Sequence, residues 1–427
     1  MIPEVKQRIE QIQQGIVPEG YTKARLGIAP TTWTPACLGD IYTERREPGN
    51  ESLPLLTVSI HSGVSDGELD EDELPKKVKR IEDKSQYKRA ATGDLVFNMM
   101  RAWQGAIGTV RTEGMVSPAY IVAKPNGKVY PPFMDYYMKA PRMVGMINRQ
   151  SYGVTDFRKR LYWDSFAPIL CVLPPVREQR KIAEILSTQD RAIELQARKI
   201  EELKRFKRGC LERMFPRKGQ KVPEKRFPGF TDDWQQRKLG DVADIVGGGT
   251  PSTAISEYWD GDIDWYAPAE MADQFFVNSS QRKITTEGLN NSSAKMLPVG
   301  TVLFTSRAGI GKTAILAKEG STNQGFQSII PHKDELDSYF IFSRTDELKR
   351  YGETIGAGST FVEVSGKQMA NMTISIPTTM EEQRQIGTYF RSLDNLITLH
   401  QRKLEEMKKQ KKALMQLLLT GIVRVKA

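Results

Sequence analysis

The feature that most constrains the fold of this 427-residue chain is an internal repeat. Glu178-Gln179-Arg180 returns as Glu382-Gln383-Arg384, and at this offset of 204 residues 13 of the 38 residues in 178–215 are identical to those in 382–419. Unrelated helical segments share far fewer identities. Because the period is much longer than that of a solenoid repeat, the pattern predicts a duplicated domain.

The repeat extends beyond these segments into two globular regions. Trp33 with Leu38-Gly39-Asp40 returns as Trp234 with Leu239-Gly240-Asp241. The order along the chain is therefore globular, helical, globular, helical, and the predicted fold class is α/β (α+β). The predicted boundaries are an N-terminal segment with a first globular domain at 1–172, a first long helix at 173–216, a linker at 217–230, a second globular domain at 231–375 and a second long helix at 376–427.

Composition restricts the class of protein. The apolar fraction of 39% is typical of a globular chain, and the longest aliphatic run is too short to span a bilayer. Three scattered cysteines and three histidines make no zinc-binding spacing, so we expect no metal site. We expect a cytoplasmic protein. The net charge of +10 favours a polyanionic partner, and with two similar halves the leading candidate is duplex DNA.

Two long helices are predicted, each beginning after proline, which suits the first helical turn. Apolar residues recur at heptad spacing and predict an antiparallel, coiled-coil-like pair. Gln189, Gln196 and His400 interrupt this pattern and either fix its register or are tolerated polar residues. We interpret the Lys/Arg runs at 204–208 and 408–412 as a solvated face. The predicted interface residues are Leu186, Ile193, Ile200, Leu203, Phe390, Ile397, Leu404 and Met407.

Two segments imitate catalytic motifs. Gly309–Thr313 resembles a phosphate-binding loop, but Ser306 stands where that motif needs its first glycine, and the first copy of the repeat has no lysine there. Tyr130-Pro131-Pro132-Phe133 imitates the catalytic tetrapeptide of amino-methyltransferases, yet a tyrosine ring cannot hold the target amino group as Asn, Asp or Ser does. The sequence therefore predicts a non-catalytic protein.

The motifs in combination resemble the specificity subunits of type I restriction–modification systems. The resemblance rests on the Pro…Glu-Gln-Arg…Ile helix starts at 174–182 and 377–386, the Arg-Lys…Glu-Glu…Lys tracts, and the segment 226–241 with Arg226-Phe227-Pro228-Gly229-Phe230 and Trp234. It implies two target-recognition domains, each reading half of a bipartite, asymmetric DNA site, with the paired helices as spacer and docking surface.

The resemblance also implies partners. Two methyltransferase subunits would bring S-adenosylmethionine and adenine methylation, and restriction–translocase subunits would bring ATP, Mg²⁺ and cleavage. The chain itself would bind double-stranded DNA, hold no cofactor and have no membrane partner.

Candidate DNA contacts come from matched stretches that follow shared strands. Side chains with paired donors or acceptors can read base edges: Arg or Lys for guanine, Asn or Gln for adenine. Lysines such as Lys159 are better suited to phosphates. The alternative is that Trp103 is core and the polar residues are ordinary loop. The candidates are Asn98, Arg101, Trp103, Gln104, Arg158 and Lys159 in the first copy, and Ser306, Arg307, Lys312, Asn323, Gln324, Ser359 and Thr360 in the second.

Two other functions stay open on sequence alone. One is a nucleotide-dependent DNA-processing enzyme that uses Gly309–Thr313. The other is a coiled-coil DNA scaffold without sequence preference, which would bind random and selected duplexes alike.

Overall fold

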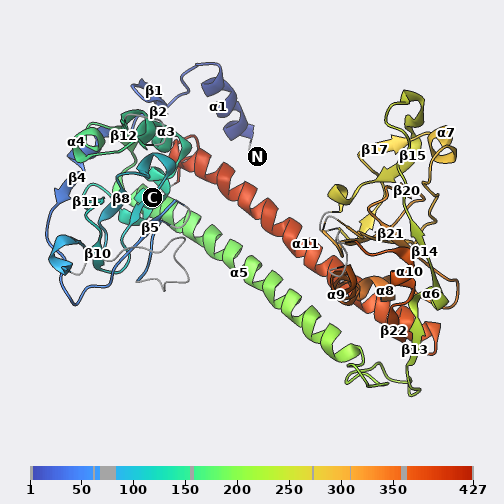
Figure 1. The fold of residues 1–427 in the computed structure, drawn as a ribbon. Coiled ribbons are helices and arrows are strands. Elements are labelled where there is room, and N and C mark those ends of the chain that lie inside the picture. Colours follow the sequence, from blue (N-terminus) through green and yellow to red (C-terminus); the bar gives the residue numbers. More distant parts are fainter. Residues whose placement is uncertain are drawn as a thin grey trace. The chain divides into compact units, whose positions relative to one another are not determined.

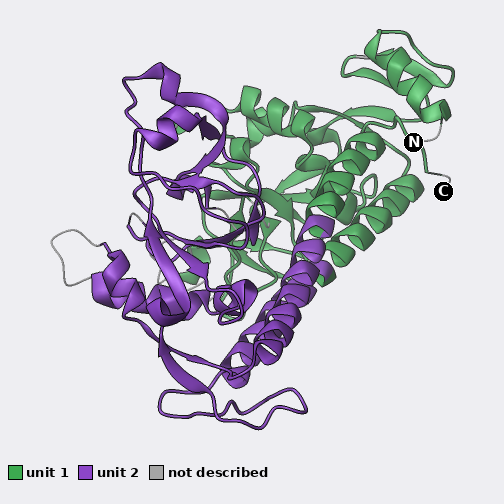
Figure 2. Cartoon of the chain, turned by 90° about the vertical axis from the view of Figure 1, so that its right-hand side faces the viewer, with its two compact units in different colours: residues 1–195, 404–427 green, residues 196–403 purple. Residues whose placement is uncertain are grey.

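The chain forms two compact units in the computed structural model (Figures 1 and 2). Unit 1 comprises residues 1–195 and 404–427, and unit 2 comprises residues 196–403. Both long helices cross from one unit into the other, so the C-terminal end of the chain belongs to the first unit. The described residues are 3–60, 63–67, 83–153, 158–271, 274–307, 309–356 and 363–425.

Unit 1 is built on an antiparallel four-stranded sheet of order β4-β11-β8-β9. Its core contains Trp33, Phe97 and Phe166 with Leu186 and Leu418 from the long helices. The sheet strands are β4 (Tyr42–Arg45), β8 (Leu95–Asn98), β9 (Ile107–Thr109) and β11 (Tyr120–Pro125). Strand pairs are β1 (Tyr21–Ala24) with β2 (Gly27–Pro30), β3 (Thr34–Cys37) with β12 (Leu170–Leu173), β5 (Val58–Ser59) with β6 (Gly63–Val64), and β7 (Lys88–Ala90) with β10 (Gly114–Val116). Helices are α1 (Pro3–Gln13), α2 (Pro131–Met138), α3 (Pro141–Gln150) and α4 (Trp163–Phe166).

Unit 2 is built on a five-stranded sheet of order β14-β21-β18-β19-β16. Its core contains Trp234, Phe340 and Phe390. The sheet strands are β14 (Ala243–Gly247), β16 (Phe276–Val277), β18 (Val302–Phe304), β19 (Thr313–Leu316) and β21 (Gln327–Pro331). Beside it are the pair β13 (Gln235–Lys238) with β22 (Thr373–Ile376) and the sheet β17 (Arg282–Ile284), β15 (Trp259–Tyr266), β20 (Ser321–Thr322). Helices are α6 (Leu239–Val242), α7 (Thr286–Asn290), α8 (Ser338–Ser343), α9 (Thr345–Gly356) and α10 (Gly366–Ala370).

The two units share their strand order. The order β4-β11-β8-β9 corresponds to β14-β21-β18-β19, and the pair β3-β12 corresponds to β13-β22. Each unit also repeats one close approach: a Cβ on Gly39 would meet the Cβ of Ala167 at 3.0 Å, and one on Gly240 would meet that of Ala370 at 2.9 Å. Glycine is required at both positions because the backbones nearly touch. The Leu-Gly-Asp repeat in the sequence therefore reflects packing.

The long helices are α5 (Val176–Met214) and α11 (Met380–Leu419). Within unit 2 their segments pack antiparallel: Gln196 Nε2 lies 2.8 Å from His400 Nδ1, while Cys210 Sγ lies 3.4 Å from Tyr389 Oη. Gln196 Nε2 also donates to the His400 carbonyl at 2.8 Å. Of the three polar residues that interrupt the heptad pattern, Gln196 and His400 are thus partners of each other. Among the eight predicted interface residues, Leu186, Ile200, Phe390 and Ile397 are buried, and Ile193, Leu203, Leu404 and Met407 are half-buried.

The repeated glutamate fastens each globular region to the start of a long helix. In unit 1, Trp33 Nε1 donates to Glu178 at 3.2 Å, and Arg424 donates two hydrogen bonds to the same carboxylate, each 2.8 Å long. These bonds raise the pKa of Arg424. The carboxylate is only 3% exposed, so it is stabilised by a charged partner and an indole donor.

Unit 2 contains the same cluster. Trp234 Nε1 donates to Glu382 at 3.3 Å, and Arg226 donates to both carboxylate oxygens at 2.7 and 2.8 Å. The hydrogen bonds to Glu382 raise the pKa of Arg226. Each arginine follows one long helix and pairs with the first turn of the other, which explains why Glu-Gln-Arg is the best preserved part of the repeat.

A second repeated cluster lies further along each helix. Tyr136 Oη donates to Asp190 at 2.8 Å, and Lys411 pairs with the same carboxylate at 2.5 Å. In unit 2, Tyr339 donates to Asp394 at 2.9 Å and Lys207 pairs with it at 2.6 Å. Lys207 and Lys411 are about one-fifth exposed, so the interpretation of the whole Lys/Arg runs as a solvated face is wrong for these two.

Candidate nucleic-acid interface

The three candidate stretches of the first copy lie side by side in unit 1. Met99 N donates to the Ala119 carbonyl at 3.1 Å, and Leu161 N donates to the Met99 carbonyl at 2.9 Å. The stretch after β8 therefore lies between the segments at 117–120 and 158–161. Lys159 Nζ lies 6.0 Å from the centre of the Trp103 ring, which brings an ammonium group to the same surface.

Unit 2 repeats this arrangement bond for bond. Ser306 N donates to the Gly325 carbonyl at 2.8 Å, and Val364 N donates to the Ser306 carbonyl at 3.0 Å. Asn98 pairs with Tyr120 in the first unit, as Thr305 pairs with Phe326 in the second. Two similar backbones thus present different side chains, which is what one scaffold that reads two different sequences requires.

These bonds set the register of the two copies at this point. Because Met99 and Ser306 occupy equivalent positions, the structural equivalent of Arg307 is Met100, and the candidate Arg101 is one residue further along. Met100 was missed as a candidate because the sequence search considered only side chains with hydrogen-bonding groups.

The predicted contact residues differ in their exposure. Arg101, Gln104, Arg158, Lys312 and Gln324 are exposed, and Asn98, Trp103, Lys159, Arg307 and Asn323 are half-buried. The prediction for Ser306 is wrong in this structure, because its side chain is completely buried beneath the two backbone bonds described above. Ser359 and Thr360 lie outside the described residues.

Local hydrogen bonds order several of these side chains. Asn98 Oδ1 accepts from Met100 N at 2.9 Å, and Trp103 Nε1 donates to the Met100 carbonyl at 3.0 Å. In unit 2, Asn323 Oδ1 accepts from Gly325 N at 2.8 Å, and Arg307 lies 3.8 Å from the Glu363 carboxylate. Asn98, Trp103 and Asn323 therefore shape the loops, while the exposed cations are better placed for a ligand.

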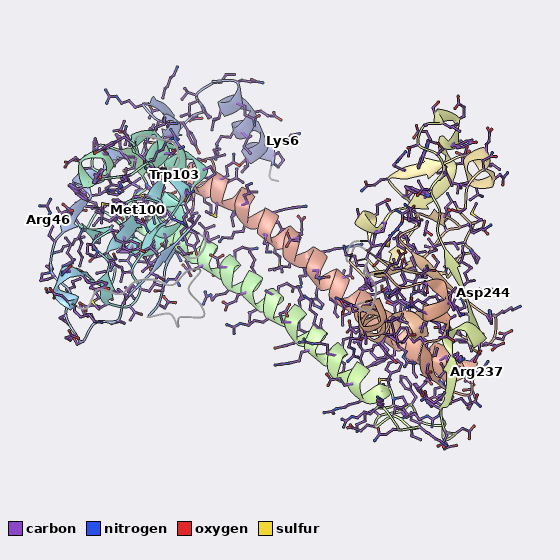
Figure 3. The ribbon with its side chains drawn as sticks, viewed as in Figure 1. Lys6, Arg46, Met100, Trp103, Arg237 and Asp244 are labelled. Atoms are coloured by element: carbon purple, nitrogen blue, oxygen red, sulfur yellow. The ribbon has the colours of Figure 1, made fainter. Side chains whose placement is uncertain are left out.

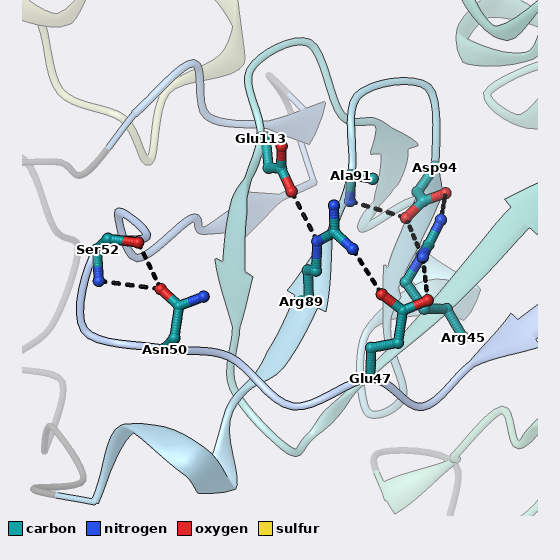
Figure 4. A network of polar contacts seen from close by, with 8 residues as sticks. All are labelled: Arg45, Glu47, Asn50, Ser52, Arg89, Ala91, Asp94 and Glu113. Atoms are coloured by element: carbon teal, nitrogen blue, oxygen red, sulfur yellow. Dashed lines mark hydrogen bonds and ion pairs between the residues drawn. The ribbon is translucent and has the colours of Figure 1, made fainter.

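An ion-pair network fixes the start of β8, the strand that leads to the first stretch (Figure 4). Asp94 is 1% exposed and accepts from Arg45 Nε at 2.7 Å and from Ala91 N at 2.8 Å. Burial raises the pKa of Asp94, and the bond from Arg45 offsets part of that effect. Arg89 joins the network by donating to Glu47 at 2.7 Å. The network thus anchors the strand that leads into the stretch at 98–104.

Comparisons with known proteins agree with this geometry. Residues 231–409 match the family model described as the type I restriction modification DNA specificity domain. Over 170 residues the chain is 40% identical to the MjaIX specificity subunit of Methanocaldococcus jannaschii, a match that covers 39% of each chain. It is 24% identical to the MjaX specificity subunit of the same organism over 96% of this chain and 97% of that one. Over these matched segments the chain is similar to type I specificity subunits.

Solved structures agree on the fold of this chain. A chain from a structure of a type I restriction–modification system has a TM-score of 0.57 at 20% identity and covers 92% of this chain and 99% of that one. The specificity subunit from M. genitalium has a TM-score of 0.53 at 11% identity over 92% and 97%. At these identities the likeness concerns the fold alone.

The loop that imitates a phosphate site has a different structure in this chain. Gly309 and Gly311 have φ of 101° and 94°, and the loop joins antiparallel strands β18 and β19. A phosphate loop instead leads from a strand into a helix whose N-terminus faces the anion. No helix in the described parts of the chain is long and apolar enough to cross a membrane. Among the same residues, no three His, Cys, Asp or Glu side chains gather as metal ligands.

The arginines of the two Trp–Glu–Arg clusters escaped sequence analysis. Arg226 and Arg424 are 198 residues apart, whereas Glu178 and Glu382 are 204 apart, so no constant offset pairs them. The sequence offers only a weak signal, since an arginine follows each long helix but Arg217 precedes Arg226 after the first.

Proposed function

We propose that this chain is a specificity subunit, the non-catalytic DNA-recognition component of a type I restriction–modification complex. It reads a bipartite, asymmetric site, with unit 1 contacting one half and unit 2 the other. The observation that carries the proposal is the pair of equivalent segments at Met99 and Ser306, which make the same two backbone hydrogen bonds and are followed by different side chains.

The remaining activities belong to partners in this proposal. The helices α5 and α11 form a coiled-coil-like spacer between two recognition domains, and they dock two methyltransferase subunits that bind S-adenosylmethionine. Restriction–translocase subunits join through the complex and bring ATP and Mg²⁺. Lysine and arginine at phosphates supply affinity, and base-edge contacts supply specificity.

The decisive experiment is to co-express the chain with its methyltransferase subunit and to map modified adenines in the host genome by single-molecule sequencing. A single split motif, methylated on both strands, supports the proposal. Exchange of residues 33–172 for those of a relative should then change one half of the motif only. A change in both halves contradicts the assignment of one unit to each half.

The two alternative functions, a nucleotide-dependent enzyme and a non-specific DNA scaffold, each predict a different result. Hydrolysis of ATP by the purified chain, lost in Lys312→Ala, supports a stand-alone enzyme. Equal affinity for random and selected duplexes at matched salt supports a non-specific scaffold, because true recognition discriminates by about 10³-fold or more.

A further inference from the structure

Met100 is an exposed apolar side chain on a fixed piece of backbone. Its side chain is 46% exposed, yet its N–H is bound by Asn98 Oδ1 at 2.9 Å and its carbonyl by Trp103 Nε1 at 3.0 Å. Figure 3 shows Met100 and Trp103 in the same part of unit 1. Most exposed methionines need no explanation, but this one has its backbone held on both sides by neighbouring side chains.

The surroundings of Met100 are those of a DNA-facing surface. Arg101 follows it and is exposed, and Lys159 lies over Trp103. The segment bound to Met99 continues into Arg160, which pairs with Tyr152, an aromatic side chain that is 59% exposed. Cations among exposed apolar groups combine phosphate attraction with surfaces that fit bases.

The equivalent residue in unit 2 indicates what kind of group Met100 can contact. Met100 occupies the backbone position of Arg307, and both follow a residue with the same two backbone bonds. An arginine there can donate to guanine O6 and N7. A methionine has no donor, so the feature of a major-groove edge that rewards it is the 5-methyl group of thymine.

We propose that Met100 contacts the 5-methyl group of a thymine in the half-site read by unit 1. This inference rests on the proposed function. Asn98 and Trp103 act as positioning residues, because they hold the Met100 backbone.

Thymine-to-deoxyuridine substitution tests the contact, because deoxyuridine lacks only the methyl group. Once the methylated motif is known, each thymine in it is replaced singly, and binding by the complex of this chain with its methyltransferase subunits is measured. We expect one position in one half-site to lose roughly fourfold in affinity, the value of one buried methyl-sized group. The Met100→Ala complex should bind normal and substituted duplexes equally at that position.

A second variant and a control keep the proposal open to refutation. Met100→Arg should shift the preference at the same position from thymine towards guanine in the methylation map. Met296→Ala removes an equally exposed methionine from unit 2 (43% exposed) and should leave the motif and the deoxyuridine response unchanged. If wild type methylates a split motif but Met100→Ala keeps the full deoxyuridine response, the Met100 contact is refuted and the proposed function stands. If wild type yields no motif, both are refuted.

Discussion

Arg424 forms a two-bond ion pair with Glu178, although 246 residues separate them in the chain. Trp33 donates to the same carboxylate, so three distant segments meet at one buried group. The equivalent cluster of Arg226, Glu382 and Trp234 contains the same three residue types. In both clusters the buried carboxylate is stabilised by its arginine and tryptophan partners, which offset the cost of removing its charge from water.

Substitution of Glu178 should weaken unit 1. Glu178→Gln keeps an acceptor for Trp33 but removes the charge that pairs with Arg424, and we expect the free energy of unfolding to fall by about 1–3 kcal/mol in urea titrations. The matched control is Asp334→Asn, because the pair of Arg384 and Asp334 is 60% and 68% exposed and should contribute less than about 1 kcal/mol. Equal effects of the two substitutions would contradict the importance of the buried cluster.

Lys411 and Lys408 should behave differently although both lie on α11. Lys411 is 23% exposed and pairs with Asp190, whereas Lys408 is 52% exposed and pairs with Glu405. We expect Lys411→Met to lower the free energy of unfolding by about 1–2 kcal/mol and Lys408→Met by less than about 0.5 kcal/mol. Combination with Asp190→Asn should give a smaller effect than the sum of the single substitutions. Strict additivity would show that Lys411 and Asp190 do not interact.

Asp264 should make unit 2 sensitive to acid. Burial raises the pKa of this 1% exposed carboxyl, but hydrogen bonds from Ser280 and Lys318 and the charge of Lys283 outweigh it and lower the pKa below 3.8. The unfolded chain then binds the proton more tightly, so this stabilisation is complete above the unfolded pKa and is lost as the pH falls through the folded pKa.

The test compares wild type with Asp264→Asn across pH. We expect wild type to be more stable by about 1–3 kcal/mol at neutral pH, and the difference to shrink below about pH 4. A difference in unfolding free energy that stays constant down to pH 3 would show that the folded pKa is not lowered.

Arg101 should contribute to one half-site only. If its guanidinium meets a phosphate, Arg101→Ala should weaken all duplexes similarly and reduce the slope of log affinity against log salt by about 1. If it meets a base, specificity at one position should relax and the cost should be about 1–3 kcal/mol. Lys6→Ala removes an exposed cation on α1, remote in sequence from the three stretches, and serves as control. Loss of specificity in the other half-site would contradict the assignment of Arg101 to the half read by unit 1.

The repeated motifs made much of the fold predictable. The repeated Glu-Gln-Arg and Leu-Gly-Asp motifs indicated two similar globular regions, and proline followed by heptad spacing indicated the helices, observed at Val176–Met214 and Met380–Leu419. These features are local: helix starts, helical periodicity and tight turns depend on neighbouring residues. The stretches at 98–104 and 158–160 were proposed as DNA contacts from the sequence, and the structure brings them side by side; their contact with DNA stays a prediction.

The contacts between segments distant in the chain could not be predicted from the sequence. The burial of Ser306 and the pairing of Lys411 with Asp190 depend on contacts between segments distant in the chain. The offset of the repeat cannot find them, because it relates one copy to the other and does not show which segments pack together within a unit.

The sequence by itself determined the duplication, the long helices and the basic character of this protein, because periodicity and charge are properties of the residues in order. Only the tertiary structure decided which arginine pairs with the buried glutamate at the start of each long helix, and which side chains are exposed. Burial and hydrogen bonding depend on which distant segments pack together, and that packing is fixed by the whole core at once.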